Sequence, residues 1–379
     1  MVHTLTSLNR LHDFVDLVKH DLRVQVVFTL APDPLGASAR RAVAALDAAV
    51  IPWEQAVHLR FDLAIAASYS QLHRLHTPLL LAPHGAGYAK LAGRPANGGP
   101  PVPRDVVGLD RQRLLFDGRV IPSALVLSHY QQREMLGQTC PEALPVAVVL
   151  GDPSADQIAA SRPHRPGYRR ALGLDGGEKL VVAVSTWGRR SLLGQHPRLF
   201  PGLAAEAAAG GGFRVAAILH PNCWTVHGKW QIEAWFAEAR RAGLLLIPPE
   251  RGWQATLAAA DAVIGDHGSV TLYAAALDIP IMLTSGFPHR DLSGAAAQRQ
   301  LARLAPRLRT DRPLLPQLVT AVDGHRPGRY APVAELITSE PGRFAEVARC
   351  QLYRMLRLPE PEEPAAQAIA PAPLVRGPD

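Results

Sequence analysis

Residues 259–283 read AADAVIGDHGSVTLYAAALDIPIML, and this stretch decides the fold class of the chain. The pattern predicts a short apolar strand at 262–264, a polar turn at 265–269, an Ala-rich helix and a second apolar strand at 280–283. Backbone N–H groups that begin a helix lack intrahelical partners, so such a turn favours an anion such as a diphosphate. Ser269 is expected near the N-cap, where its hydroxyl serves the helix, a phosphate, or both. Any α/β protein needs Gly and Ser at such a turn, so the stretch alone does not establish a binding site.

Apolar segments of the same kind occur along the whole chain, with helical spacers between several of them. Their continuous hydrophobicity is typical of parallel sheets that are covered on both faces. We therefore predict an α/β protein with two Rossmann-like domains facing each other across a cleft. The predicted domains are residues 1–155 on the acceptor side and 156–355 on the nucleotide-donor side, with a disordered tail at 356–379. The predicted strands are 23–30, 61–68, 78–83, 123–128 and 146–150 in the first domain, and 179–186, 213–220, 244–247, 262–264 and 280–283 in the second; helices are expected at 38–49, 204–209, 229–242 and 251–260.

Length and charge narrow the class of protein. With 379 residues the chain exceeds the size at which one core keeps growing. Forty basic and 33 acidic residues give a net charge of +7, which favours nucleotides, phosphorylated polymers or an anionic membrane face as partners. A nucleic-acid partner is disfavoured because no zinc-finger spacing, RNA-binding signature or basic-aromatic stripe is present.

Cysteine usage and hydropathy predict a cytoplasmic protein. The three cysteines, Cys140, Cys223 and Cys350, are far apart and odd in number, which argues against a disulfide framework. No apolar run approaches the roughly 18 residues that a membrane span requires. Any membrane contact is therefore expected to be peripheral.

Several motifs that would indicate other chemistry are missing from the sequence. No Gly-x-Gly-x-x-Gly turn follows the first strand of either half, which disfavours a dinucleotide oxidoreductase. No Walker motif is present either. His73 and His76 lie three residues apart, but no third ligand is spaced to join them. We therefore expect no metal and no cofactor, with a nucleotide diphosphate donor bound as substrate.

Polar residues that follow the apolar segments are the strongest site candidates, because ligands of open α/β sheets bind at the carboxyl ends of the strands. In the first half, His84 follows a strand and precedes Gly85 and Gly87, which would let a substrate approach the backbone. Its imidazole titrates near neutrality, so it can act as a general base. His129 and Tyr130 follow another strand of the first half and are weaker candidates for the acceptor side.

In the second half, His220 precedes Pro221 and could donate to a phosphate oxygen. Both His84 and His220 could instead only hydrogen-bond a loop, and an arginine that follows a strand could be merely solvated. The candidate donor-binding residues are Ser185, Thr186, Gly188 and Arg189 after one strand, with Arg190 beside them, and Asp266, His267, Gly268 and Ser269 after another.

These paired His-Gly and His-Pro turns, followed by the late serine turn, an Ala-rich helix and a Pro-led strand, resemble the GT-B transferases. Within them they resemble the teichoic-acid type CDP-glycerol glycerophosphotransferases, over most of residues 78–285. The resemblance implies that His84 acts as base at the acceptor hydroxyl and that His220 assists the donor diphosphate. It also implies that Gly268 and Ser269 clasp donor phosphates, with Asp266 alongside. Two departures concern the donor: the family commonly has two hydroxyl residues at 268–269, and the helix at 271–276 lacks the carboxylate that many GT-B enzymes place on the donor ribose.

The sequence thus predicts a metal-independent transferase that moves a glycosyl or glycerophosphate group from a nucleotide-diphosphate donor to an acceptor hydroxyl. Two alternatives stay open. A UDP-sugar epimerase would need carboxylates in the cleft, for which Asp266 and Asp152 are the candidates. A non-catalytic nucleotide-binding protein would bind the same ligands without turnover.

Overall fold

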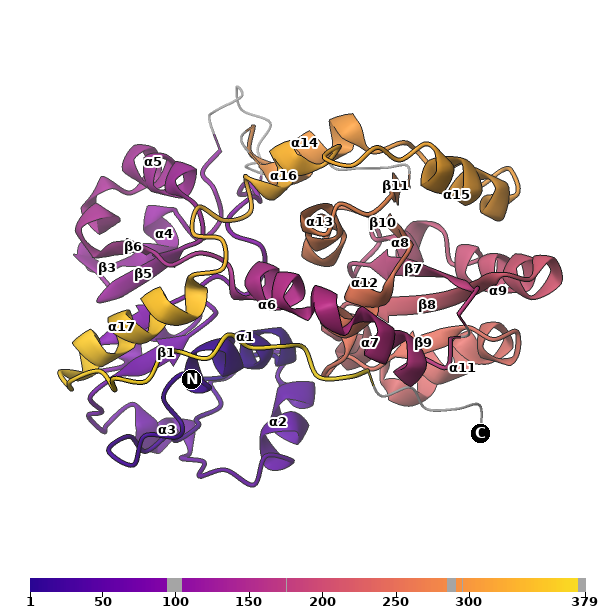
Figure 1. Ribbon diagram of the computed structural model, residues 1–379. Coiled ribbons are helices and arrows are strands. Elements are labelled where there is room, and N and C mark those ends of the chain that lie inside the picture. Colours follow the sequence, from indigo (N-terminus) through magenta and orange to yellow (C-terminus); the bar gives the residue numbers. More distant parts are fainter. Residues whose placement is uncertain (94–103, 175, 285–290, 295, 374–379) are drawn as a thin grey trace. The chain divides into compact units, whose positions relative to one another are not determined.

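Two parallel sheets, each with its own core, organise the protein in the computed structural model, which describes residues 1–93, 104–174, 176–284, 291–294 and 296–373 (Figure 1). The chain divides into two compact units. Unit 1 comprises residues 1–153, 290–296 and 337–367, and unit 2 comprises 154–289, 297–336 and 368–379. The predicted second domain extended without interruption to residue 355, whereas residues 337–355 belong to unit 1.

The sheet of unit 1 contains four parallel strands in the order β1-β2-β5-β6. In its register Leu81 lies beside both Ala66 and Leu125, so the carboxyl ends of these three strands meet at one edge. The strands are β1 (Ala64–Ala66), β2 (Leu79–Leu81), β5 (Ala124–Leu127) and β6 (Ala147–Val149), and a separate hairpin joins β3 (Leu115–Phe116) to β4 (Arg119–Val120).

Both faces of this sheet are buried, as the apolar sequence predicts. Leu79 and Leu81 belong to one core cluster and Leu80 to another, because successive side chains of a strand point to opposite faces. Phe14 and Phe344 cover Leu80 and meet edge to face, with ring centroids 5.3 Å apart. The helices of unit 1 are α1 (Leu5–Val15), α2 (Ala37–Ala44), α3 (Trp53–Ala56), α4 (Arg111–Leu114), α5 (Tyr130–Thr139) and α17 (Phe344–Leu356), with short 3-10 helices at Leu72–Arg74 and Pro141–Val146.

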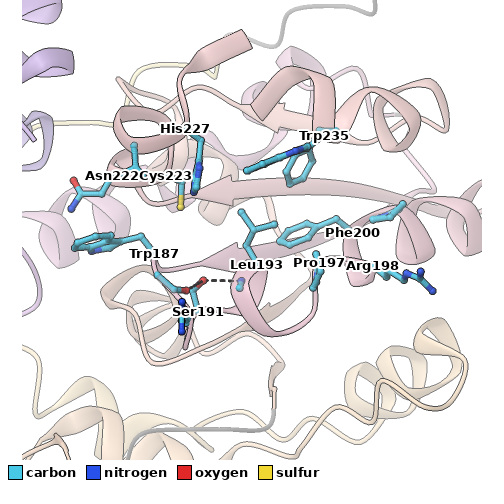
Figure 2. Close-up of a pocket in the computed structure, with 16 residues that line it drawn as sticks. Trp187, Ser191, Leu193, Pro197, Arg198, Phe200, Asn222, Cys223, His227 and Trp235 are labelled. Atoms are coloured by element: carbon cyan, nitrogen blue, oxygen red, sulfur yellow. Dashed lines mark hydrogen bonds between the residues drawn. The ribbon is translucent and has the colours of Figure 1, made fainter. Parts of the chain in front are cut away.

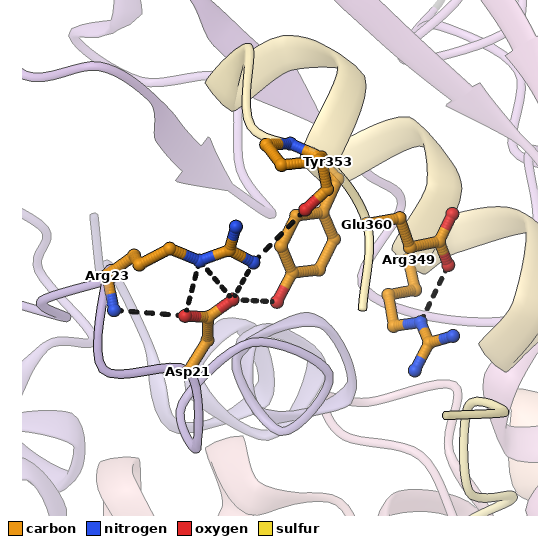
Figure 3. Close-up of polar contacts among 6 residues, drawn as sticks. Asp21, Arg23, Arg349, Tyr353 and Glu360 are labelled. Atoms are coloured by element: carbon orange, nitrogen blue, oxygen red, sulfur yellow. Dashed lines mark hydrogen bonds and ion pairs between the residues drawn. The ribbon is translucent and has the colours of Figure 1, made fainter. Parts of the chain in front are cut away.

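Helix α17, late in the chain, packs against residues near its start. Tyr353 donates a hydrogen bond of 2.7 Å to the carboxylate of Asp21, which also forms an ion pair of 2.7 Å with Arg23 (Figure 3). The Arg23 guanidinium and the Tyr353 hydroxyl hold the pKa of Asp21 well below its usual range, Arg23 being the larger cause. Arg349 pairs with Glu360 at 2.7 Å and so fixes the segment that follows the helix.

The sheet of unit 2 contains five parallel strands in the order β11-β10-β7-β8-β9. Its buried strands again form continuous apolar runs, and the alternate residues Val181 and Ala183 of β7 belong to a cluster with Phe200, Phe236 and other helix residues. The strands are β7 (Lys179–Ser185), β8 (Phe213–Leu219), β9 (Leu245–Ile247), β10 (Ala262–Gly265) and β11 (Ile281–Leu283). The helices are α6 (Pro153–Ser161), α7 (Arg165–Ala171), α8 (Leu192–Gln195), α9 (Leu199–Gly210), α10 (Pro221–His227), α11 (Lys229–Arg241), α12 (Trp253–Ala259), α13 (Ser269–Ala276), α14 (Ala297–Leu304), α15 (Leu314–Asp323) and α16 (Ala331–Ala334), with a 3-10 helix at Arg162–His164.

Two predicted segments differ in the structure. Residues 23–30 do not form a strand: only Phe28 and Leu30 make isolated bridges, to Val50 and Val2. The predicted disordered tail is also ordered in part, because Ala370 is 3% exposed and its backbone bonds Ser161 and Tyr168. The order of this segment thus depends on buried contacts with unit 2, which its Pro-rich sequence does not reveal. Residues 374–379 lie outside the described part.

The search for membrane-spanning helices in the described residues found none that combines the length and the apolar character that a span needs.

Candidate functional site

The register of the unit 2 sheet brings four predicted site residues to one edge. Ser185, the last residue of β7, lies beside Leu219 of β8, so Thr186 and His220 both begin the loops that leave this edge. In the neighbouring β10, Ile264 lies beside Ala183. Asp266, two residues later, therefore lies at the level of Ser185. The carboxyl ends of β7, β8 and β10 form the candidate donor site.

Asp266 joins two of these loops through its side chain. One carboxylate oxygen, Oδ2, accepts hydrogen bonds from the Thr186 backbone N–H at 2.8 Å, from the Thr186 hydroxyl at 2.7 Å and from the Leu192 N–H at 2.9 Å. The other, Oδ1, accepts from the Gly268 N–H at 3.0 Å. Asp266 is only 5% exposed. Its carboxylate therefore acts as a positioning group that holds the loop after β7 against the turn after β10.

The close approach of these two loops requires glycine at position 268. A Cβ atom there would lie 2.5 Å from Cγ2 of Thr186 and 3.2 Å from Oδ1 of Asp266. Gly268 is also the N-cap residue of α13, which has no side-chain cap hydrogen bond, and Ser269 is the first helical residue. The helix start is thus formed by backbone, with Ser269 half-buried beside it.

The hydroxyl groups of Ser185 and Thr186 form hydrogen bonds within the protein. The Ser185 hydroxyl donates to the Thr186 carbonyl at 2.8 Å and accepts from the Leu193 N–H at 2.9 Å, and the side chain is 2% exposed. These contacts shape the loop that leads into α8. Gly188 (φ +85°) and Arg189 lie further along this loop and are exposed, and so is Arg190.

His220 caps helix α10. Its Nδ1 accepts a hydrogen bond of 3.0 Å from the Asn222 N–H, and its ring lies 6.4 Å from that of Trp187 at a tilt of 30°. Because Nδ1 accepts, the neutral ring carries its proton on Nε2, which is then a hydrogen-bond donor. His129 caps α5 of unit 1 in the same way, through a 3.0 Å bond from the Gln131 N–H. His267 is half-buried in the turn between β10 and α13.

His84 is exposed at the carboxyl end of β2 in unit 1. Desolvation by the surrounding protein, aided by the cations Lys90 and Arg10, lowers the pKa of His84 to about 4, while a hydrogen bond with the Ala67 backbone opposes the shift. The ring is therefore neutral at neutral pH and able to accept a proton.

The turn after His84 is held by residues that the sequence analysis did not single out. The Gly85 carbonyl accepts hydrogen bonds from the Gly87 N–H at 2.9 Å and from Arg10 Nη2 at 3.4 Å, and Arg10 pairs with Asp13 at 3.1 Å. Gly87 has φ +60°, and a Cβ there would lie 2.3 Å from Nε2 of Gln132. Burial raises the pKa of Asp13 to about 7, against the opposing influence of Arg10. The only available signal for Arg10 and Asp13 was their spacing of three on an apolar helix, which is common on surfaces.

The remaining candidates fall outside these two edges. The ring of His73 stacks on Phe116 with centroids 4.2 Å apart. Among the described residues, no group of three or more His, Cys, Asp or Glu is placed to hold a metal ion. Asp152 is 1% exposed, so both carboxylates considered for an epimerase, Asp152 and Asp266, are buried within their own units.

A scan against protein-family models finds no match, and neither does a search of the curated proteins. Among solved structures, the wall teichoic acid polymerase TagF, in a histidine-to-asparagine variant soaked with CDPG, matches 91% of this chain and 85% of its own chain, with a TM-score of 0.61 and 10% identity. A second histidine variant of TagF, substituted with alanine, matches 93% of this chain and 86% of its own, with a TM-score of 0.60 and 10% identity.

This chain has the GT-B fold. The predicted α/β class with parallel sheets and the predicted resemblance to teichoic-acid type GT-B proteins are thereby confirmed. That the two domains face each other across a cleft stays a prediction. Identity this low establishes fold alone, so the roles of His84, His220 and the donor-binding residues stay predictions. Their predicted convergence on one groove also stays a prediction, because His84 and His220 belong to different units.

Proposed function

We propose that this protein is a metal-independent transferase that moves a glycosyl or glycerophosphate group from a nucleotide-diphosphate donor to an acceptor hydroxyl. The observation that carries the proposal is the edge of the unit 2 sheet, where His220, the turn at 266–269 and the start of α13 come together on a GT-B fold. The TagF structure soaked with CDPG makes CDP-activated donors the first to test.

The phosphate of the departing nucleotide would bind at this edge; that nucleotide is a nucleoside diphosphate in glycosyl transfer and a nucleoside monophosphate in glycerophosphate transfer. His220 offers an Nε2–H, and the first turn of α13 offers backbone N–H groups whose dipole favours negative charge. Each well-placed donor that acts on developing charge contributes about 3 kcal/mol to the transition state. Asp266 would serve this function indirectly, by holding the two loops in register.

The acceptor hydroxyl would lose its proton to His84. The neutral imidazole can accept a proton, and Arg10 holds the adjacent turn by donating a hydrogen bond to the Gly85 carbonyl. In the transfer step the acceptor oxygen forms a bond to the donor's transferred group, the bond to the departing phosphate oxygen breaks, and the hydroxyl proton moves to His84.

The test measures donor binding and turnover separately. Thermal shifts with CDP, UDP, GDP and dTDP identify the base, and turnover is then assayed with the corresponding activated donor. We expect His84→Ala to reduce kcat at least 100-fold with an unchanged thermal shift, and His58→Ala, which replaces an exposed histidine of the same unit, to have no effect. Unchanged turnover in His84→Ala would contradict the assignment of the base.

The two alternatives give different results in the same assays. A non-catalytic nucleotide-binding protein would show thermal shifts with no product from any donor. An epimerase would convert a UDP-sugar without any acceptor present.

A further inference from the structure

A large apolar pocket lies in unit 2 next to the candidate donor site and shares with it two predicted donor-binding residues, Gly188 and Arg189. It has a volume of about 610 Å³, and it is bordered by the segment from residue 187 to residue 201, which contains α8 and the start of α9, and by helices α10 and α11 (Figure 2). This volume falls within the range of about 300 to 1,000 Å³ that small-molecule sites occupy. The transfer chemistry proposed above uses none of its apolar side chains.

The interior of the pocket offers almost no polar recognition. Leu193, Phe200 and Trp235 line the pocket (Figure 2), and Phe236 completes the aromatic lining. Burial, and secondarily Asp266, raises the pKa of the Cys223 thiol to about 12, so this side chain stays protonated and behaves as a small apolar group. A nucleobase or a sugar buried here would lose hydrogen bonds to water and find few uncharged polar partners, Ser191, Asn222 and His227 among the lining residues, whereas a hydrocarbon chain would lose none.

The mouth of the pocket combines exposed apolar side chains with cations. Trp187, Val226 and Trp235 are 44%, 53% and 51% exposed. Two arginines, Arg189 and Arg198, also line the pocket and are exposed, and none of the sixteen lining residues is acidic. Indole rings and arginines together suit the boundary between hydrocarbon and lipid headgroups, and the absence of carboxylates suits an anionic headgroup.

We propose that this pocket binds the hydrocarbon chain of an anionic membrane lipid, with Trp187, Val226 and Trp235 entering the headgroup region and Arg189 and Arg198 facing the anionic heads. A membrane is favoured over a free amphiphile because three apolar side chains that line the pocket are exposed, and a ligand held inside would leave them in water. The inference does not rest on the proposed transferase activity.

The experiment uses the full chain and vesicles of phosphatidylcholine with 30% phosphatidylglycerol, against pure phosphatidylcholine, in a flotation assay. Val226→Glu places a charge at the mouth, and Trp235→Ala removes an aromatic wall. Trp230→Ala is the matched control, because Trp230 lies on the same helix, is 78% exposed and does not line the pocket. We expect each pocket variant to weaken binding to the anionic vesicles at least fivefold, and the control to change it less than twofold.

Quenching by lipids brominated along the acyl chain tests insertion directly. We expect tryptophan emission of the unmodified protein to be quenched, and quenching to fall in Trp235→Ala but not in Trp230→Ala. Melting temperatures within 2 °C of the parent for all variants would show that the fold is intact. Equal binding of pocket and control variants, or binding of monomeric fatty acid without binding of vesicles, would overturn the proposal.

Discussion

Asp266 shows how a single buried carboxylate can hold two loops of a candidate site together. Its two oxygens accept four hydrogen bonds from two loops, so removing its charge leaves backbone N–H groups without a matched acceptor. We expect Asp266→Asn to lower the free energy of unfolding by about 2 to 4 kcal/mol, because an unsatisfied buried donor costs about 1 to 3 kcal/mol. Urea denaturation measures this change. Asp323→Asn, at an exposed helix end, is the control and should change stability by less than about 0.5 kcal/mol.

The pKa of His84 leads to a prediction about pH. A free histidine becomes protonated as the pH falls through about 6.5, but desolvation by the surrounding protein lowers the pKa of His84 to about 4. If His84 is the base, lowering the pH from 8 to 5 leaves it neutral, and the acid limb of kcat/KM that belongs to it lies near pH 4. Asp13, with a pKa of about 7, ionises within this range, so the profile is compared with that of Asp13→Asn. An acid limb near pH 6.5 that persists in Asp13→Asn would contradict a lowered pKa of His84.

The sequence identified residues at strand ends better than it identified their contacts. Strand periodicity placed Thr186, His220 and Asp266 at one edge because that inference needs only the ends of apolar runs. It did not reveal that Ser185, Thr186 and Asp266 bond the protein itself, since an exposed and a bonded hydroxyl look alike in sequence. Arg10 and Asp13 were missed because their partner, the turn after His84, lies about 75 residues away in the chain.

At the scale of elements, the turn after β2 depends on the absence of a side chain. A Cβ at Gly87 would lie 2.3 Å from Nε2 of Gln132, which bonds Ser128 through both its amide atoms. We expect Gly87→Ala to cost about 2 to 4 kcal/mol, of which the left-handed backbone accounts for about 1 kcal/mol and crowding for the rest. Gly118 has φ +74° with open space around it, so Gly118→Ala isolates the backbone contribution. An equal loss of unfolding free energy in the two variants would show that the neighbours of residue 87 move aside at no energetic cost.

The caps of α10 and α5 allow the structural role of His220 to be separated from its proposed chemistry. Asparagine is a good N-cap residue, so His220→Asn should restore the bond to the Asn222 N–H and keep the melting temperature within about 2 °C. His220→Ala should lose about 1 kcal/mol, as His129→Ala should in unit 1. If His220 also assists the diphosphate, both substitutions at 220 reduce kcat to a similar extent. Full turnover in His220→Asn would show that the histidine serves only as a cap.

Secondary structure was predicted well where elements are long and buried, and poorly where they are short. Strands β7 and β8 match their predicted ranges closely, because their apolar runs are packed on both faces. Residues 23–30 have the residue types of a strand but find only two isolated bridges. The hairpin of β3 and β4 went unpredicted although Asp117 and Gly118 both have positive φ, since two-residue strands carry too little periodicity to detect.

At the scale of the whole molecule, α17 completes a unit that begins 343 residues earlier in the chain. Phe344 is 4% exposed and packs against Phe14 beneath the β2 strand. We expect Phe344→Ala to destabilise unit 1 by about 3 to 5 kcal/mol through the cavity that it leaves. Denaturation followed by hydrogen exchange locates the loss, which should affect β2 and β5 more than β7 and β8. Phe116→Ala, at a 48% exposed position, is the control.

The assignment of residues 337–367 to unit 1 could not be made from the sequence. A helix that follows the second domain in the chain looks like its continuation, because the amphipathic pattern of α17 does not reveal which core it covers. The contacts of its Phe344 with Phe14 and of its Tyr353 with Asp21 are visible only in the structure.

The return of α17 has a consequence for biosynthesis. A ribosome delivers the strands of unit 1 early, but the helix that packs on Leu80 and Val126 leaves the exit tunnel only after the described strands of both units. Unit 2, whose strands all lie between residues 179 and 283, can assemble sooner than the unit that precedes it. Nascent chains stalled when residue 336 has just left the exit tunnel should therefore have a protease-sensitive unit 1 and an already resistant unit 2, the reverse of the order in which the two units emerge.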